Sequence, residues 1–398
     1  MEVKEIYMEK QYKIGTDEQQ AYLKDYNIAP KGCAFLEPGV VAKDAKEFVA
    51  FNIAKSFYQV YPEVFNLPYI AKKVGLTAEE VGKRIKRMYD EKLFMLVSNS
   101  YVGIMGFGLY YWVVKLKKDT TKEEREELMK WFQENDQICT GYMMEEGGDF
   151  DYFNGNHMRN LDNLIYGVLD KFRTNRCVEY VHILPIRRLV RESHVNMFDC
   201  KEDYRHYFWS DEQLKNVLKM QKKMDKYDFA IIDAINNCAS VGDMFDYDVL
   251  AKLSGLYAKE MKTDIMKIVD EQKTIIPMIY FNYASLGLKL HFFVVSLFQN
   301  TPTYRVEQIC DELAKDPSFE NIFDCCDGHH NFVLSAYEGI TDIDKIREKI
   351  LSYGEVIEVL EANSPRQFRR WTCRLDDKNG FYEECIFTDD VLLDRSKE

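Results

Sequence analysis

The sequence of 398 residues has no run of about 20 apolar residues, the length with which an α-helix crosses a bilayer. Residues 1–7 read Met-Glu-Val-Lys-Glu-Ile-Tyr and lack the apolar core of a signal peptide. The ten cysteines include no Cys-x-x-Cys pair, and adjacent cysteines such as Cys325 and Cys326 cannot easily chelate one ion or form an unstrained disulfide. We therefore expect a cytoplasmic protein with reduced thiols, no membrane partner, no metal and no bound cofactor.

Basic residues are fewer than acidic ones, 53 against 66, so the formal net charge is −13. A chain of this sign repels a phosphate backbone at long range, and any nucleic-acid contact needs a local basic patch. Hydrophobic residues make up 46% of the chain and aromatic residues 14%, which is enough apolar surface for folded cores. We expect a globular chain of about two to four domains.

One pattern occurs twice, 180 residues apart. Residues 147–152 read Gly-Gly-Asp-Phe-Asp-Tyr, and residues 327–332 read Asp-Gly-His-His-Asn-Phe. Two further landmarks recur at the same step: Gly75 with Gly255, and Pro185 with Pro365. Three matches at one offset predict a tandem duplication in which each half is one module.

Each half begins with a predicted winged helix-turn-helix. In the first half, a short helix over 67–74 ends at Gly75. A helix over 78–92 then opens with a capping box made of Thr77 and Glu80. Helix, glycine turn and capped helix are typical of this motif. The strand-like segments that follow predict a two-stranded wing: 93–98 and 101–105.

The capped helix carries a cluster of basic residues: Lys83, Arg84, Lys86 and Arg87. A solvated helix can also carry such residues, but these lie on the element that the motif inserts into the major groove. We therefore predict that they contact double-stranded DNA. The matching helix of the second half, 257–271, is nearly neutral and a poor phosphate binder, so we expect a structural or protein-contact role for it.

After each winged helix, the pattern of apolar residues predicts the order βαββαβ, the ferredoxin-like plait. In the first half we expect strand 110–116, helix 122–135, strands 137–144 and 151–156, helix 161–172 and strand 178–184. The second half repeats this order over 290–360. The open face of each sheet is apolar, so we expect the two plaits to pair within the chain as a pseudo-dimer.

The predicted fold class is α+β, with two winged helix-turn-helix domains that are each followed by a ferredoxin-like βαββαβ domain. The predicted boundaries, in chain order, are an N-terminal arm 1–43, winged helix 44–106, plait 107–199, linker 200–225, winged helix 226–286, plait 287–376 and acidic tail 377–398.

The helix-turn-helix sequence over 67–88, followed by a plait whose central turn reads Gly-Asp-Phe-Asp-Tyr, resembles the Lrp/AsnC family of regulators. The resemblance covers about 44–199 and 225–376. It implies that the plaits bind an amino acid near their interface, with Gly148, Asp149 and Asp151 in the central turn. In the second copy, this turn has lost both carboxylates. Family members pair through their plaits, so further assembly into a homo-oligomer is open.

Siroheme decarboxylases share this architecture, and the chain is similar to them as well. Basic stretches close the two plaits at matching positions: Arg187, Arg188 and Arg191, and Arg366, Arg369 and Arg370. The resemblance implies a polycarboxylate tetrapyrrole as substrate, because guanidinium groups pair with carboxylates. His329 and His330 would then transfer protons as the catalytic residues. The alternative is that the arginines only neutralise surface carboxylates and that the histidines are only exposed.

The sequence thus leaves three hypotheses. We place first a ligand-responsive, DNA-binding transcriptional regulator with a small-molecule site at the paired plaits. The alternatives are a tetrapyrrole-modifying enzyme resembling a fused siroheme decarboxylase, and a ligand-sensing scaffold that does not bind DNA. The ligand would be an amino acid or a tetrapyrrole.

Overall fold

The computed structural model describes residues 68, 71–72, 75–90, 94–100, 108–135, 138–158, 160–192, 263, 275–281, 289–316, 318–326, 328–338, 341–364, 366–370, 375–376 and 380–381. Several predictions lie outside these residues: the arm, the linker, the acidic tail, and the helices expected over 45–59, 227–237 and 249–254. The winged helix domains therefore stay predictions. No helix among the described residues is both long and apolar enough to cross a membrane.

Both halves contain the predicted order βαββαβ. The first plait consists of β2 (Gly108–Leu116), α6 (Lys122–Glu134), β3 (Ile138–Met143), β4 (Tyr152–Met158), a helical segment of α7 (Leu161–Leu164), η2 (Ile165–Leu169) and α8 (Asp170–Arg173), and β5 (Val178–Glu192). The second consists of β7 (Lys289–Leu297), α13 (Thr303–Ala314), β8 (Asn321–Cys325), β9 (Phe332–Glu338), α14 (Ile343–Leu351) and β10 (Val356–Ser364). The fold is a mixed α/β structure with antiparallel sheets.

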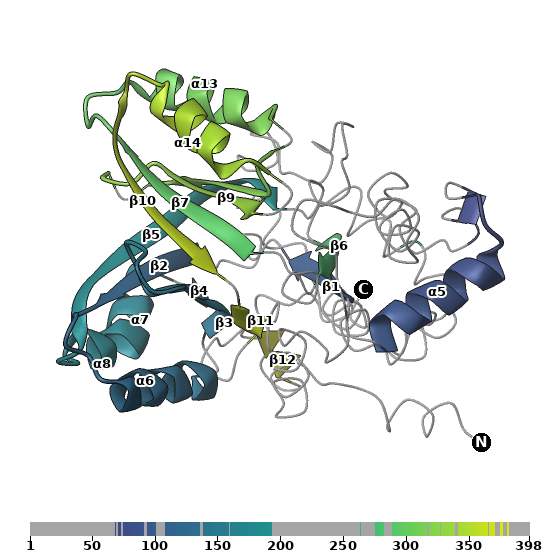
Figure 1. Ribbon diagram of the computed structural model, residues 1–398, viewed down its shortest axis with the longest axis horizontal. Helices are drawn as coiled ribbons and strands as arrows, with labels where there is room; N and C mark the ends of the chain where they lie inside the picture. The colour runs from purple at the N-terminus through teal and green to yellow at the C-terminus, as the bar shows by residue number, and fades with distance from the viewer. Residues whose placement is uncertain are drawn as a thin grey trace, which may run out of the picture.

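Each plait has its own core on the helix-covered face of its sheet. In the first, alternate residues of β2 such as Trp112 and Val114 pack against Phe132 of α6 and Phe172 of α8. In the second, Phe293 and Val295 of β7 pack under α13 and α14. Figure 1 shows the helices of the two plaits on opposite outer sides, with the strands between them.

The other faces of the two sheets meet in an interface that we call the seam. Phe153 of the first plait stacks on Phe292 of the second with ring centroids 4.6 Å apart, and Tyr142 meets Phe292 at 5.0 Å. Tyr111 contacts Phe323 at 4.9 Å. Aromatic pairs of this kind add about 0.5–1.5 kcal/mol each beyond the area that they bury. The predicted pairing of two apolar sheet faces within the chain is confirmed.

The two plaits also share one nine-stranded sheet, in the order β10-β7-β9-β8-β5-β2-β4-β3-β11. The link between the halves is β5, which was predicted to end at residue 184 but continues to Glu192 and pairs with β8. Pro185 does not interrupt it, because its carbonyl points toward β8 and accepts from the N–H of Cys326 at 2.9 Å. Its missing N–H lies on that same side, so the pairing with β2 loses no bond.

A short strand, β11 (Arg366–Arg370), closes the arrangement. It follows β10 in the chain but pairs with β3 at the opposite end of the strand order. The two edges of the sheet therefore come together, and the N–H of Glu145 donates to the carbonyl of Asn363 at 2.8 Å.

Two elements outside the plaits bear on the winged-helix prediction. The predicted capped helix is present as α5 (Ala78–Asp90), with the reciprocal hydrogen bonds of Thr77 and Glu80. The first expected wing strand is present as β1 (Phe94–Ser100), and it pairs with β6 (Ile275–Phe281) of the second half. Its expected partner, 101–105, lies outside the described residues.

Candidate functional site

The central turns of the two plaits share a side-chain contact, although their positive-φ glycines stand one position apart in register. Gly147 and Gly328 adopt φ of 97° and 81°, where a side chain would be strained, but the position 180 residues before Gly328 is Gly148. After each turn, a side-chain oxygen accepts the N–H at the end of the first strand. Asp151 accepts from Leu116, and Asn331 accepts from Leu297, both at 2.8 Å. The change from aspartate to asparagine therefore keeps this bond, and we assign Asp151 a structural role.

Asp149 forms two hydrogen bonds with β10 of the other plait. Its N–H donates to the carbonyl of Glu361 at 2.8 Å, and its carboxylate accepts the N–H of Glu361 at 2.7 Å. Gly148 lies so close to this strand that a Cβ would come within 2.8 Å of the Cβ of Ala362. In the turn expected to bind an amino acid, the N–H and the carboxylate of Asp149 thus both bind the other plait.

The arginines of β5 reach under α13, on the helix side of the second plait. Arg187 and Arg188 flank the buried carboxylate of Asp324, and Arg187 also pairs with Glu307 on α13 at 3.3 Å. Burial raises the pKa of Asp324, although both guanidinium groups act to lower it.

Arg191, farther along β5, caps the C-terminal end of α13. It donates to the backbone carbonyls of Ala314, Asp316 and Phe319 at 2.6–2.9 Å. Arg366, Arg369 and Arg370 lie on β11, at the far end of the strand order, and their side chains lie outside the described residues. The contacts described for Arg187, Arg188 and Arg191 are thus with Asp324, with α13 and with the segment that follows α13.

What the structure does bring together is a set of polar side chains at one rim of the seam, which we call the histidine cluster: Tyr180 and His182 of β5, Ser296 of β7, His329 and His330 of the β8–β9 turn, and Glu358 of β10. It contains residues of both plaits. Of these residues, only His329 and His330 were singled out from the sequence.

The rings of the cluster form a continuous row. The centroid of His182 lies 4.5 Å from that of Tyr180 and 4.9 Å from that of His330. The hydroxyl of Tyr180 donates to the carbonyl of Asp149. The row thus runs from the first central turn to the second.

Hydrogen bonds and charges join the second-plait members. Nδ1 of His330 lies 3.0 Å from Oγ of Ser296, which lies 3.5 Å from Oε2 of Glu358. Nε2 of His329 lies 3.4 Å from the same carboxylate oxygen. His329, His330 and Glu358 are also a group whose ligand atoms lie within 4.8 Å of one another, so they could hold a metal ion.

The surroundings shift the pKa values of two residues in the cluster. His330 is 1% exposed, and burial, aided by the neighbouring His182 and His329, lowers its pKa to about 4. Burial and then the carboxylates nearby, Asp149 first, raise the pKa of Tyr180 to about 12. At neutral pH, the imidazole is uncharged and the phenol keeps its proton.

The sequence carried a weak signal for the missed members. His182 and Tyr180 are two residues apart on a predicted strand, so they had to share a face. Whether that face pointed to the seam, and which turn it met, depends on the pairing of the plaits. Ser296 and Glu358 belong to no motif, and only the register of β7 with β10 brings them together.

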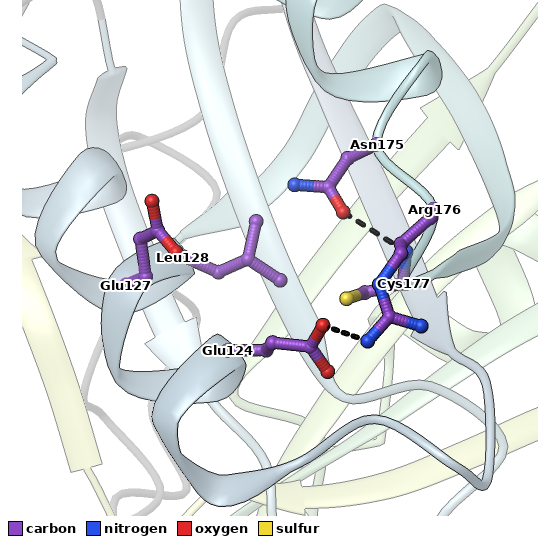
Figure 2. Close-up of a pocket in the computed structure, with 6 residues that line it drawn as sticks. All are labelled: Glu124, Glu127, Leu128, Asn175, Arg176 and Cys177. Atoms are coloured by element: carbon purple, nitrogen blue, oxygen red, sulfur yellow. Dashed lines mark hydrogen bonds and ion pairs between the residues drawn. The ribbon is translucent and has the colours of Figure 1, made fainter.

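A separate cavity of about 290 Å³ lies on the first plait, at the start of α6 and before β5, lined by Glu124, Glu127, Leu128, Asn175, Arg176 and Cys177. Figure 2 shows Glu124 directed at Arg176 across it. Glu124 also completes the capping box of α6. The second plait has a similar bridge with the charges reversed, Arg305 to Glu355 at 2.7 Å. We therefore infer that these ion pairs are structural and fix the first helix of each plait to the segment before its last strand.

The predicted DNA-binding residues are described only in part. On α5, Lys83 is exposed and pairs with Glu79 at 2.6 Å, while Arg84 is half-buried. The side chains of Lys86 and Arg87 lie outside the described residues.

No family model and no curated protein match the sequence. Among solved structures, siroheme decarboxylase NirDL matches with 13% identity and a TM-score of 0.50, over 85% of this chain and 94% of that one. The chain shares its fold with that siroheme decarboxylase. A second NirDL structure, a co-complex with an iron-uroporphyrin III analogue, matches over 82% of this chain and 94% of that one, with the same identity and TM-score. AsnC from E. coli matches with 14% identity over 35% of this chain and 91% of that one, at a TM-score of 0.28.

Proposed function

We propose that this chain is a tetrapyrrole-modifying enzyme of the siroheme decarboxylase type, and that the histidine cluster receives a carboxylate side chain of the substrate. The observation that carries the proposal is the row of Tyr180, His182 and His330, which both plaits contribute to one rim of the seam. The likeness in fold to NirDL, which spans both halves, supports it.

An amino acid is a poorer candidate for the ligand. A zwitterion at the first central turn would need the N–H and the carboxylate of Asp149, and the backbone of Glu361 already binds both. Displacing β10 would leave those strand groups without partners, at about 1–3 kcal/mol each if they stay buried. The rim, by contrast, offers imidazole nitrogens for hydrogen bonds to a carboxylate, and the hydroxyl of Tyr180 would need to exchange only its one bond to the carbonyl of Asp149.

The chemistry assigns a role to Tyr180. Decarboxylation breaks the bond between the carboxylate carbon and its neighbour, releases CO₂, and leaves an electron pair on carbon that takes up a proton. A phenol with a pKa of about 12 stays protonated at neutral pH and is far more acidic than the resulting carbon acid. Tyr180 would deliver this proton, and His182 beside it would hold the carboxylate.

Siroheme added to the purified protein tests this proposal through its absorbance spectrum and through mass analysis of the products. We expect binding, loss of CO₂, and a fall in turnover of roughly 100-fold or more in Tyr180→Phe with binding retained. His182→Ala should weaken binding by roughly 10- to 100-fold, the effect of losing one hydrogen bond to a charged group.

His157→Ala is the matched control. His157 pairs with Leu109 near one end of β2, whereas Tyr180 pairs with Lys115 near the other. Six residues of strand separate them by about 20 Å. A protein that neither binds nor converts siroheme, or that responds equally to all three substitutions, would refute the proposal.

A regulator remains the second candidate, because the capped helix α5 is present with Lys83 exposed on it. Its test is a gel shift with genomic fragments. DNA binding that is lost in Lys83→Glu with Arg87→Glu and kept in Lys259→Glu would support a regulator. If the protein does not bind DNA, or if the Lys83→Glu and Arg87→Glu substitutions together leave binding unchanged, the regulator hypothesis is rejected.

A further inference from the structure

We propose that His329, His330 and Glu358 form a binding site for a divalent transition-metal ion of the zinc class. The proposal goes beyond the suggested decarboxylase activity, and metal binding can be tested without any tetrapyrrole. Two imidazoles and one carboxylate suit Zn²⁺ and its neighbours, whereas Mg²⁺ and Ca²⁺ prefer oxygen ligands alone.

The distances fit such an ion. Zinc bonds to nitrogen and oxygen measure about 2.0–2.1 Å, so two ligand atoms in a tetrahedral site lie about 3.3 Å apart. Nε2 of His329 and Oε2 of Glu358 are separated by 3.4 Å. The ligand atoms of all three residues lie within 4.8 Å of one another. Closing the wider separations to about 3.3 Å would fall to rotations of His329 and Glu358, whose side chains are half-exposed.

Ser296 supplies the outer hydrogen bonds that a metal site needs. Its hydroxyl lies 3.0 Å from Nδ1 of His330 and 3.5 Å from Oε2 of Glu358. If Nδ1–H donates to the hydroxyl and the hydroxyl donates to the carboxylate, Nε2 of His330 becomes the metal-binding nitrogen. Outer partners of this kind fix the tautomer and orientation of ligating histidines.

Hydrogen bonds fix the turn that carries the two histidines. The turn is fixed by Asn331, whose side chain accepts from Leu297 and whose carbonyl accepts from Cys325. His330 is 1% exposed and acts as the buried anchor. The side chains of His329 and Glu358 are 50% and 45% exposed, which leaves an entry path and room for water or a substrate carboxylate.

The site is not repeated at the matching positions of the first plait. The positions 180 residues earlier are Asp149, Phe150 and Val178, which cannot supply the same ligands. If the halves arose by duplication, the histidine turn has these ligands and the acidic turn instead contacts β10.

Titration calorimetry of the full-length, metal-stripped protein with ZnCl₂, and absorbance after adding CoCl₂, test the inference. We expect one equivalent of Zn²⁺ or Co²⁺ to bind above any background, a Co²⁺ spectrum typical of four-coordinate geometry, and no binding of Mg²⁺. His329→Ala and Glu358→Gln change exposed side chains and should each weaken binding more than about tenfold, and Ser296→Ala should weaken it by roughly 10- to 100-fold.

His291→Ala is the control, because His291 also lies beside a glutamate, at 3.1 Å from Glu361, but its glutamate is engaged by Arg347. The His291→Ala variant should bind Zn²⁺ with the same affinity as the unaltered protein. Circular dichroism confirms that each variant is folded. The inference is overturned if no equivalent binds, or if His329→Ala with Glu358→Gln together leaves the affinity unchanged. Either result leaves the siroheme experiment intact, since that test measures a different ligand.

Discussion

Asp151 and Asn331 show how a conspicuous motif residue can be structural. Each accepts the N–H that ends the first strand of its plait, and Asp151 also pairs with Arg125 at 3.1 Å. The carboxylate suggested a ligand site because the resemblance placed it in a binding turn. The amide at the matching position shows that the shared requirement is an oxygen acceptor, not a negative charge.

A pair of substitutions at Asp151 separates these roles. Asp151→Asn keeps an acceptor for Leu116 and should lower the free energy of unfolding by less than about 1 kcal/mol, the worth of a partly exposed ion pair. Asp151→Ala leaves a buried N–H without its acceptor and should cost about 1–3 kcal/mol. Urea unfolding measures both. Equal losses would contradict the assignment.

Asp324 is the counter-charge for two arginines of the other plait and is 1% exposed. Asp324→Asn should lower the free energy of unfolding by about 3–5 kcal/mol, because the buried guanidinium of Arg188 would lose its counter-charge. Thermal or urea unfolding gives the value. Asp344→Asn is the control, since its ion pair with Arg347 is 84% exposed on the aspartate side and its loss should stay within about 0.5 kcal/mol.

Strand β10 makes side-chain and backbone contacts that no sequence pattern predicted. One face of the strand carries Glu361, which receives Arg347 of α14 at 2.8 Å and His291 of β7 at 3.1 Å. Its backbone binds Asp149 of the other plait. Burial alone would raise the pKa of Glu361, but the hydrogen bonds from His291 and Arg347 lower it to about 2.

This shift predicts a pH-dependent contribution to stability. The folded pKa lies below the unfolded value of about 4.3, so the stabilisation is complete above that value and is lost as the pH falls through about 2. Glu361→Gln should therefore be less stable than the unaltered protein by about 1–3 kcal/mol at pH 7. Urea unfolding from pH 7 down to pH 2 should show this difference shrinking below about pH 4. A constant difference would mean that the carboxylate charge contributes nothing.

At the scale of the whole described structure, the seam and the strand β5 that crosses into the second plait join the two plaits. Phe292 touches both Phe153 and Tyr142 of the first plait, and the β5–β8 ladder joins the sheets into one. Because both plaits contribute side chains to the seam, a substitution in it should destabilise both plaits.

Phe292→Ala tests that coupling. Phe292 is 1% exposed, and truncating it should cost about 3–5 kcal/mol. We expect calorimetry to show one transition for the two plaits, moved to lower temperature as a unit. Hydrogen exchange should likewise speed up in β4 and β7 together. Exchange that increases in the second plait alone would show that the plaits unfold independently.

The order βαββαβ, the capped helix α5 and the apolar face of each sheet followed from the sequence, because they depend on local periodicity and capping residues. The seam between the plaits also followed, since an apolar sheet face must be covered. The reach of β5 beyond residue 184 did not, because that pairing depends on β8, more than 100 residues away. The roles of Asp149 and Arg191 were likewise decided by contacts with the other plait. Of the histidine cluster, the sequence indicated only His329 and His330. Tyr180, His182, Ser296 and Glu358 joined it only through the placement of three strands and a turn, which no local pattern encodes.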